Sequence, residues 1–175
     1  RAYPNKKDLS ELDYIEAHAT STQVGDATEL GALAGLLSSH IQSGKKVPIG
    51  SVKANVGHTL ETAGLASLVK VVLAMDHNSI PPGTTAKEFN DEFDWRDGPF
   101  RVPKSTERWD PRKDGKPRLA AVNAFGIGGL NVHLAIAEHI DDEAPVEPTP
   151  VQSVSVRPLT VRNQLAHDEP IAIVG

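Results

Sequence analysis

Two histidines occupy similar positions in the sequence and could act together on one substrate. His18 follows the strand-like run 12–17, and His58 lies in a turn after the strand-like run 47–52. A helix-like segment follows each histidine. Because imidazole exchanges protons near neutral pH, two imidazoles delivered from equivalent strand ends suit acyl-transfer chemistry. The chain contains no cysteine, so this layout lacks a thiol nucleophile.

Polar residues near both histidines strengthen this interpretation. Lys53 lies on the same segment as His58, and Thr20, Ser21 and Thr22 follow His18. A lysine in a polar pocket biases the charge of nearby groups. Taken singly, a strand-end histidine is more often structural and such hydroxyls more often cap a helix. The combination favours a functional site.

A glycine-rich segment, 126–129, supplies a third candidate element. It lacks the spacing of a dinucleotide-binding loop and lies between two strand-like runs instead of before a helix. Glycines allow close backbone approach. We therefore interpret this segment as a tight connection whose backbone N–H groups face a site and could bind an oxyanion.

The elements that carry these residues form two strand–helix units. In the first unit, the helix is expected to start at residues 25–29, where Asp26 and Glu29 can cap backbone N–H groups reciprocally. Gly44 is expected to end it. The second unit pairs strand 47–52 with a helix over 61–76.

The second predicted helix contains small residues and an apolar stripe. Small residues, Ala63, Gly64 and Ala66, would let it approach a sheet or another helix closely. Its larger apolar stripe consists of Leu65, Leu68, Val69, Val72 and Leu73. Pro81-Pro82-Gly83 prevents continuation of the helix.

The rest of the chain predicts a long connection, two more strands and a tail. Residues 84–117 are polar and irregular, and Trp95, Phe100 and Trp109 are expected to pin them to the body. Runs 118–123 and 131–138 read as strands. We interpret 141–168 as an acidic, proline-containing linker and 169–175 as the first strand of a following domain. The chain is accordingly expected to be a piece of a longer polypeptide.

Composition excludes several classes of function. With 18 basic and 23 acidic residues and a net charge of -5, the chain does not predict nucleic-acid binding. Neither an apolar run long enough for a membrane span nor a signal peptide is readable in these residues, and we expect a cytoplasmic protein. The histidines are dispersed and cysteine is absent, so no metal site or disulfide is predicted.

Three motifs together resemble the C-terminal half of a β-ketoacyl synthase (ketosynthase) domain. They are residues 16–22 with Gly25-Asp26, residues 53–58, and residues 123–131. The resemblance covers about residues 8–139 and is closest to ketosynthases of polyketide and polyunsaturated fatty acid synthases. It implies an α/β, thiolase-like fold, layered αβαβα in the complete domain, with only the C-terminal half in residues 1–140. The last residues, 169–175, also look like the opening strand of a ketosynthase-type domain.

The resemblance implies a decarboxylative Claisen condensation. An acyl chain would sit on a cysteine of the N-terminal half, delivered by the phosphopantetheine arm of an acyl carrier protein. A malonyl-type extender on that carrier would lose CO2, with His18 and His58 stabilising the enolate and Lys53 tuning the histidines. The family usually forms homodimers, and no cofactor is bound directly. This chain alone is expected to be inactive as an acyltransferase because its nucleophilic cysteine is absent.

Further residues match positions around the substrate. By resemblance, Thr20 and Thr22 contact the pantetheine amides, the backbone N–H of Ile127 belongs to the oxyanion hole, and Phe125 and Ile127 gate the acyl tunnel. The chain also departs from the family pattern. The differing positions are Ala19 and Ser21 in place of glycines, Ile127 in place of phenylalanine, and Leu130 in place of threonine. These departures concern tunnel shape and gating, while the catalytic matches are intact.

Three alternative functions remain open. A non-catalytic, chain-length-factor-like ketosynthase partner is the main one, although such domains often lose the histidines that this chain retains. A thiolase-type enzyme acting on coenzyme A thioesters would normally use a second cysteine in this half. The third alternative is a purely structural dimer or docking role for the proline-rich, acidic tail.

Overall fold

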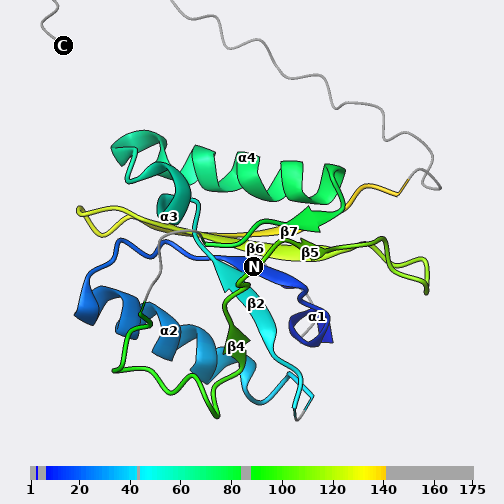
Figure 1. Ribbon diagram of the computed structural model, residues 1–175, viewed down its shortest axis with the longest axis horizontal. Coiled ribbons are helices and arrows are strands. Elements are labelled where there is room, and N and C mark those ends of the chain that lie inside the picture. Colours follow the sequence, from blue (N-terminus) through cyan, green and yellow to red (C-terminus); the bar gives the residue numbers. More distant parts are fainter. Residues whose placement is uncertain (1–2, 4–6, 43, 84–87, 141–175) are drawn as a thin grey trace, which may run out of the picture. The chain divides into compact units, whose positions relative to one another are not determined.

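A computed structural model describes residues 3, 7–42, 44–83 and 88–140 of the chain. Within them, one sheet lies between two helical faces (Figure 1). The predicted linker 141–168 and the predicted strand 169–175 lie outside the described residues.

The sheet has five strands in the order β4-β2-β1-β6-β7. Their bounds are Tyr14–Glu16 for β1, Val47–Gly50 for β2, Phe100–Arg101 for β4, Leu119–Phe125 for β6 and Asn131–Ala137 for β7. Strand β1 pairs in parallel with both β2 and β6, β4 is parallel to β2, and β7 is antiparallel to β6. The carboxyl ends of β1, β2 and β6 therefore meet at one edge of the sheet.

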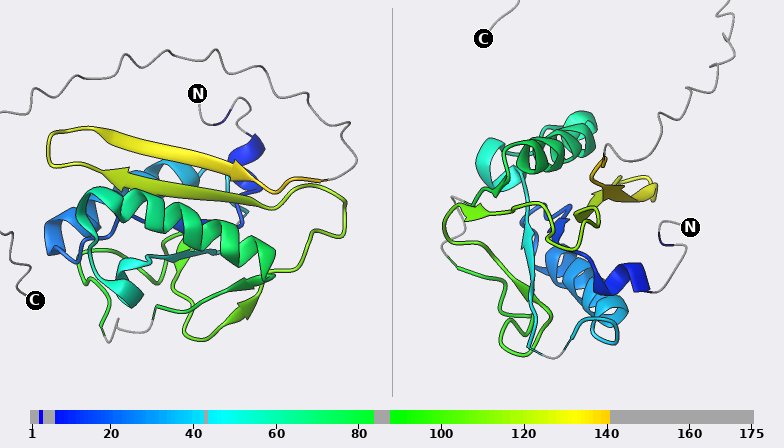
Figure 2. Two further views of the ribbon diagram at one scale, coloured as in Figure 1. Left: turned by 90° about the horizontal axis from the view of Figure 1, so that it is seen from above. Right: turned by 90° about the vertical axis from the view of Figure 1, so that its right-hand side faces the viewer.

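The helices cover both faces of the sheet. Helix α2 (Gln23–Leu37) packs on one face and α4 (Ala63–Asp76) on the other, as Figures 1 and 2 show. The described residues also contain three shorter helices: α1 (Lys7–Ser10), α3 (Lys53–Val56) and the 3-10 turn η1 (Leu60–Thr62). Among the described residues, no helix has the length and apolar character needed to cross a membrane.

The predicted helix bounds need correction at both ends of α2. The helix begins at Gln23 with Thr22 as its N-cap, and it ends at Leu37. Gly44 has a left-handed φ of 83°, but it lies in a turn beyond the helix. The prediction of a helix over 61–76 is confirmed, with its first turn formed by η1.

Two short strands lie in the region 84–117 that was expected to be irregular. They are β4 and β5 (Glu107–Arg108), and β5 pairs in antiparallel fashion with β3 (Ser79–Ile80), which precedes the region. Two-residue strands have no detectable alternation, so the sequence pattern could not show them. The predicted anchoring is confirmed, because Phe100 and Trp109 are buried and Trp95 packs against the core.

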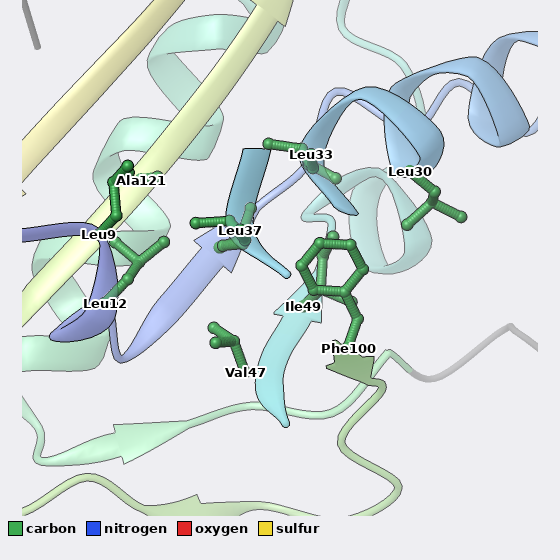
Figure 3. Packing of buried hydrophobic residues seen from close by; sticks show 11 residues of the cluster. Leu9, Leu12, Leu30, Leu33, Leu37, Val47, Ile49, Phe100 and Ala121 are labelled. Carbon is green, nitrogen blue, oxygen red and sulfur yellow. The ribbon is translucent and has the colours of Figure 1, made fainter. Parts of the chain in front are cut away.

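The core consists of two hydrophobic clusters, one on each face of the sheet. The first lies between α2 and the sheet (Figure 3) and contains Leu9, Leu12, Ile15, Ala17, Leu30, Leu33, Leu37, Val47, Ile49, Phe100 and Ala121. The second lies beneath α4 and contains Tyr14, Val71, Ala74, Met75, Ile80, Trp109, Ala120 and Val122. Successive residues of β1 alternate between the clusters, as the pleat of a strand requires. Burial on both faces therefore fixes the position of β1.

Helix α4 approaches the sheet closely at its small residues, buries Val71 and Met75, and leaves several other large apolar side chains exposed. A Cβ added at Gly64 would lie 3.1 Å from the Cβ of Ala124, so the helix approaches β6 closely, as predicted. The outer face has exposed fractions of 50–64% at Leu65, Val69, Val72 and Leu73. An apolar face of this kind is typical of a surface that another protein layer covers.

A buried ion pair connects α4 to the end of β1. The Glu16 carboxylate is fully buried and accepts hydrogen bonds at 2.8 Å from both the Lys70 ammonium and the Tyr14 hydroxyl. It also accepts the backbone N–H of Val52, the residue before α3. Burial, together with the nearby Glu16 charge, raises the pKa of Tyr14 well above its usual range. This cluster ties β1, α3 and α4 together.

We predict that Lys70→Met destabilises the domain by about 3–5 kcal/mol, because it leaves the buried Glu16 carboxylate without its cation. The double variant Glu16→Gln/Lys70→Met should recover much of this loss. Pulse proteolysis in urea on the full polypeptide, following cleavage within residues 1–140, measures both effects. If the single and double variants lose equal amounts of unfolding free energy, the proposed importance of the ion pair is contradicted.

Candidate active site

The predicted histidines converge at the edge where the parallel strands end. His18 follows β1, His58 follows β2 and α3, and Phe125 ends β6. The rings of His18 and His58 have centroids 6.0 Å apart and are nearly perpendicular, at 89°. The His18 ring also lies 5.2 Å from the Phe125 ring. The structure thus brings together residues that are far apart in the sequence.

Backbone donors fix which nitrogen of each imidazole carries the proton. The backbone N–H of Phe125 points at Nδ1 of His18, at 3.3 Å, and that of Leu60 at Nδ1 of His58, at 2.9 Å. A ring nitrogen that accepts a hydrogen bond carries no proton, so each neutral imidazole is protonated at Nε2. Both histidines are therefore set up to donate from Nε2.

The electrostatic environment keeps His18 neutral. Burial lowers its pKa below the ordinary 6.5, and the Lys53 cation lowers it further, against the opposing effect of Glu29. Burial also lowers the pKa of Lys53, while Glu16, Glu29 and Asp26 act in the opposite direction. Neutral His18 can accept the Phe125 N–H at Nδ1, which the protonated ring could not.

A buried carboxylate holds the backbone of His18 in place. Glu29, on α2 and only 7% exposed, accepts hydrogen bonds from the backbone N–H groups of His18 and Ala19, each at 2.9 Å. It also accepts one from the side-chain amide of Asn123 on β6, at 2.8 Å. The predicted role of Glu29 in capping its own helix is therefore wrong. Its carboxylate instead links α2 to the site segment and to β6.

Asp26 acts on the next part of the same segment. The backbone N–H groups of residues 20–22 hydrogen-bond to its carboxylate, which tends to lower its pKa. Burial and the neighbouring Glu29 charge outweigh these bonds and raise the pKa of Asp26. Asp26 is not the N-cap of α2; it reaches back from the first turn. Together, the two carboxylates bind the backbone N–H groups of residues 18–22.

This binding matters because the segment contains unfavourable backbone conformations. Ala19 has a φ of 34° and Ser21 a φ of 65°, in the region that favours glycine. Such conformations cost roughly 1–2 kcal/mol per residue with a side chain. The hydrogen bonds to Glu29 and Asp26 offset that cost. They keep the turn tight at the two positions where the sequence departs from glycine.

A cavity of about 390 Å³ adjoins the histidine pair. Lys53, His58 and Thr20 contribute to its polar wall, whereas His18 is not among the residues that line it. Its apolar wall includes Leu30, Ile49, Phe89 and Trp95. The cavity therefore lies beside the histidine pair, with Lys53 and His58 both on its wall.

Two predicted site residues lie apart from the pair. Thr22 is exposed at the start of α2 and does not line the cavity. Ile127 is fully exposed in the connection between β6 and β7, which is closed by a 2.9 Å hydrogen bond from the Gly126 N–H to the Leu130 carbonyl. The predicted strand–connection–strand arrangement is confirmed. Within the described part of the chain, no cluster of three or more metal-ligating side chains is present.

Sequence reasoning missed the functions of Glu29 and Asn123. A polar Asn123 within the otherwise apolar run of β6 was the available signal, because a buried amide needs hydrogen-bond partners. The sequence could not show that its partner would be a carboxylate 94 positions away.

Comparison with a family model and with curated proteins gives consistent matches. Residues 4–87 match the model described as beta-ketoacyl synthase, C-terminal domain. The chain is 41% identical over 140 residues to the highly reducing polyketide synthase azaB of Aspergillus niger, covering 80% of this chain and 5% of that protein. It is 34% identical over 163 residues to the pikromycin polyketide synthase component PikAIII of Streptomyces venezuelae, covering 92% and 10%, respectively.

A solved structure shows the same arrangement of elements. The ketosynthase from module 6 of the bacillaene synthase from Bacillus subtilis 168 superposes with a TM-score of 0.70 at 32% identity. The match covers 79% of this chain and 28% of that chain. The chain thus spans less than a third of the length of each of these three proteins.

We predict that Lys53→Met raises the pKa of His18 toward its ordinary value of 6.5, because the substitution removes a nearby cation and keeps the side-chain volume. Titration of the imidazole signals by NMR, in the smallest folded part of the full polypeptide that contains residues 1–140, measures the shift. Lys116→Met, which removes an exposed cation distant from His18 in the sequence, is the control. An unchanged or lowered pKa in Lys53→Met would contradict the assigned electrostatics.

Proposed function

This chain carries the C-terminal part of a ketosynthase domain of the polyketide synthase kind, and we propose that its site performs the decarboxylation step of a Claisen condensation. The sequence prediction of an α/β, thiolase-like fold class is confirmed by the solved ketosynthase. The polyketide synthases that the chain matches are much longer than the chain, which agrees with a ketosynthase domain within a multidomain synthase. The observation that carries the proposal is the pair of adjacent imidazoles, each fixed with its proton on Nε2.

The proposed step uses these two N–H groups as donors. The thioester carbonyl oxygen of a malonyl-type extender accepts from Nε2 of His18 and His58. The bond between the extender's α-carbon and its carboxylate breaks, CO2 leaves, and the electron pair forms an enolate whose negative charge lies on that oxygen. Preorganised donors stabilise charge at the place where it develops. Burial and then the positive charge of Lys53 lower the pKa of His18, which favours its neutral state.

The enolate carbon then attacks an acyl thioester that the rest of the synthase supplies. We propose that a cysteine of the N-terminal half carries this acyl group, and that this half covers the apolar surface around the site. Val56, Leu60, Ile127 and Leu130 have exposed fractions of 60–110%. Attack expels the cysteine thiolate and leaves a β-ketoacyl chain on the carrier. The present chain supplies no thiol, so alone it would not condense substrates.

The carrier arm and the acyl chain account for the remaining site residues. We propose that the phosphopantetheine arm of an acyl carrier protein approaches Thr20 and Thr22, and that the protein works as a homodimer. Thr20 lines the cavity beside His58, which supports its assignment. The contact of Phe125 with the His18 ring supports a gating role for this residue. The Ile127 N–H is proposed as a donor to the oxyanion of the cysteine-bound thioester.

The main rival is a non-catalytic, chain-length-factor-like partner. Such a domain has no need of two imidazoles with a defined tautomer. Here the Nδ1 atoms of His18 and His58 are both occupied by backbone donors, and the supporting carboxylates are present. This arrangement favours the catalytic alternative.

We predict that His18→Ala and His58→Ala each lower malonyl-carrier decarboxylation by the full polypeptide by about 10²–10³-fold, as loss of an oxyanion donor does. The released CO2 measures the rate. The matched control is His77→Ala, because His77 is exposed at the end of α4 and distant from the site. Retention of the wild-type rate in either site variant would refute the proposed step.

We further predict that Ile127→Phe changes the preferred acyl-chain length more than it changes decarboxylation. The side chain at 127 projects from the connection beside the proposed acyl tunnel and makes no hydrogen bond to the imidazoles that the proposal requires. Competition between acyl donors of different length, with CO2 release assayed in parallel, tests this. Equal losses in both assays would argue against a gating role.

A further inference from the structure

We propose that His133 and Asn123 are positioning residues for His18, acting through Glu29 as one hydrogen-bonded chain. The kinetic consequence of this proposal rests on the proposed decarboxylation. Neither residue touches the place where the extender would bind. Their effect would reach His18 through the carboxylate that binds its backbone.

The chain of contacts is continuous across the sheet. The Tyr3 hydroxyl lies 2.8 Å from Nε2 of His133, and Nδ1 of His133 lies 2.5 Å from the Asn123 side-chain oxygen. The Asn123 amide then donates to Glu29 at 2.8 Å, and Glu29 accepts the His18 N–H at 2.9 Å. Asn123 and His133 are direct partners in the pairing of β6 with β7. The strand register therefore sets this alignment.

In this series of hydrogen bonds, every donor hydrogen points toward the Glu29 carboxylate. The Asn123 oxygen can only accept, so Nδ1 of His133 carries the proton and its Nε2 accepts from the Tyr3 hydroxyl. Burial supports these protonation states, because it lowers the pKa of His133 and raises that of Tyr3 to about 12. Asn123 is 2% exposed and Glu29 is 7% exposed, so water does not substitute readily for a lost donor.

Strand β6 consequently holds His18 at two points. The backbone N–H of Phe125 fixes the His18 ring, and the side chain of Asn123 fixes the His18 backbone through Glu29. If Asn123 loses its orientation, Glu29 loses a donor, and the strained turn at Ala19 loses part of its support. The expected result is a displaced His18 ring, with the substrate-binding surface otherwise unchanged.

The experiment compares three variants of the full polypeptide. His133→Leu removes the donor, and His133→Gln retains a donor and an acceptor. Ile136→Ala removes packing from the same strand outside the chain of contacts. We expect kcat for malonyl-carrier decarboxylation to fall about tenfold in His133→Leu, with KM changed less than about twofold. His133→Gln should recover most of the wild-type kcat. Ile136→Ala should retain the wild-type kcat when rates are calculated per concentration of folded protein.

A second readout does not depend on activity. Hydrogen exchange at the His18 and Ala19 amides should accelerate about tenfold or more in His133→Leu, but not in His133→Gln or Ile136→Ala. If His133→Leu does not fold, His133→Met fills a similar space without a donor and replaces it in both measurements.

The outcomes separate this proposal from the proposed function. If His18→Ala leaves decarboxylation unchanged, the proposed function fails, and the exchange rates alone decide the positioning role. If His18→Ala abolishes decarboxylation but His133→Leu keeps the wild-type kcat, the positioning role is overturned. The same holds if His133→Gln and Ile136→Ala lose as much kcat as His133→Leu, because the effect is then one of stability.

Discussion

The carboxylate of Glu29 is the group on which the geometry of the site depends. A buried anion is costly unless hydrogen-bond donors surround it. Here the donors come from the segment after β1 and from Asn123 on β6, while the carboxylate itself belongs to α2. The hydrogen bonds to the Glu29 carboxylate therefore fix three parts of the chain relative to one another. It also stabilises the left-handed backbone at Ala19, directly after the histidine that the site requires.

A second buried carboxylate has a comparable role on the other side of β1. Glu16 binds the Lys70 ammonium and the N–H of Val52, the residue that precedes the helical turn bearing Lys53. Strand β1 lies between β2 and β6, so its end is the natural meeting point of the segments that follow all three strands. The parallel sheet brings these segments together, and the carboxylates then determine their detailed positions. In this way the fold can orient two imidazoles whose rings approach edge to face.

Much of this arrangement could be predicted from the sequence, for identifiable reasons. The strand-end positions of His18 and His58 followed from hydrophobic runs, and parallel strands necessarily place such residues at one edge. The close approach of α4 through Gly64 followed from side-chain size. Glu29 was misassigned because a carboxylate near a helix start has the same local pattern whether it caps that helix or binds a distant segment. The partners of Asn123 and the two-residue strands depend on long-range pairing, which local patterns do not contain.

We propose that the two Nε2–H groups form one binding site for the extender's thioester oxygen. A crystal structure of the full polypeptide with a non-cleavable malonyl-pantetheine analogue would show this site. We expect the analogue's carbonyl oxygen at about 2.7–3.1 Å from Nε2 of both His18 and His58, with each Nδ1 still bound to its backbone donor. An analogue whose carbonyl contacts neither imidazole, or imidazoles that present Nδ1 to it, would refute a binding site formed by the two Nε2–H groups.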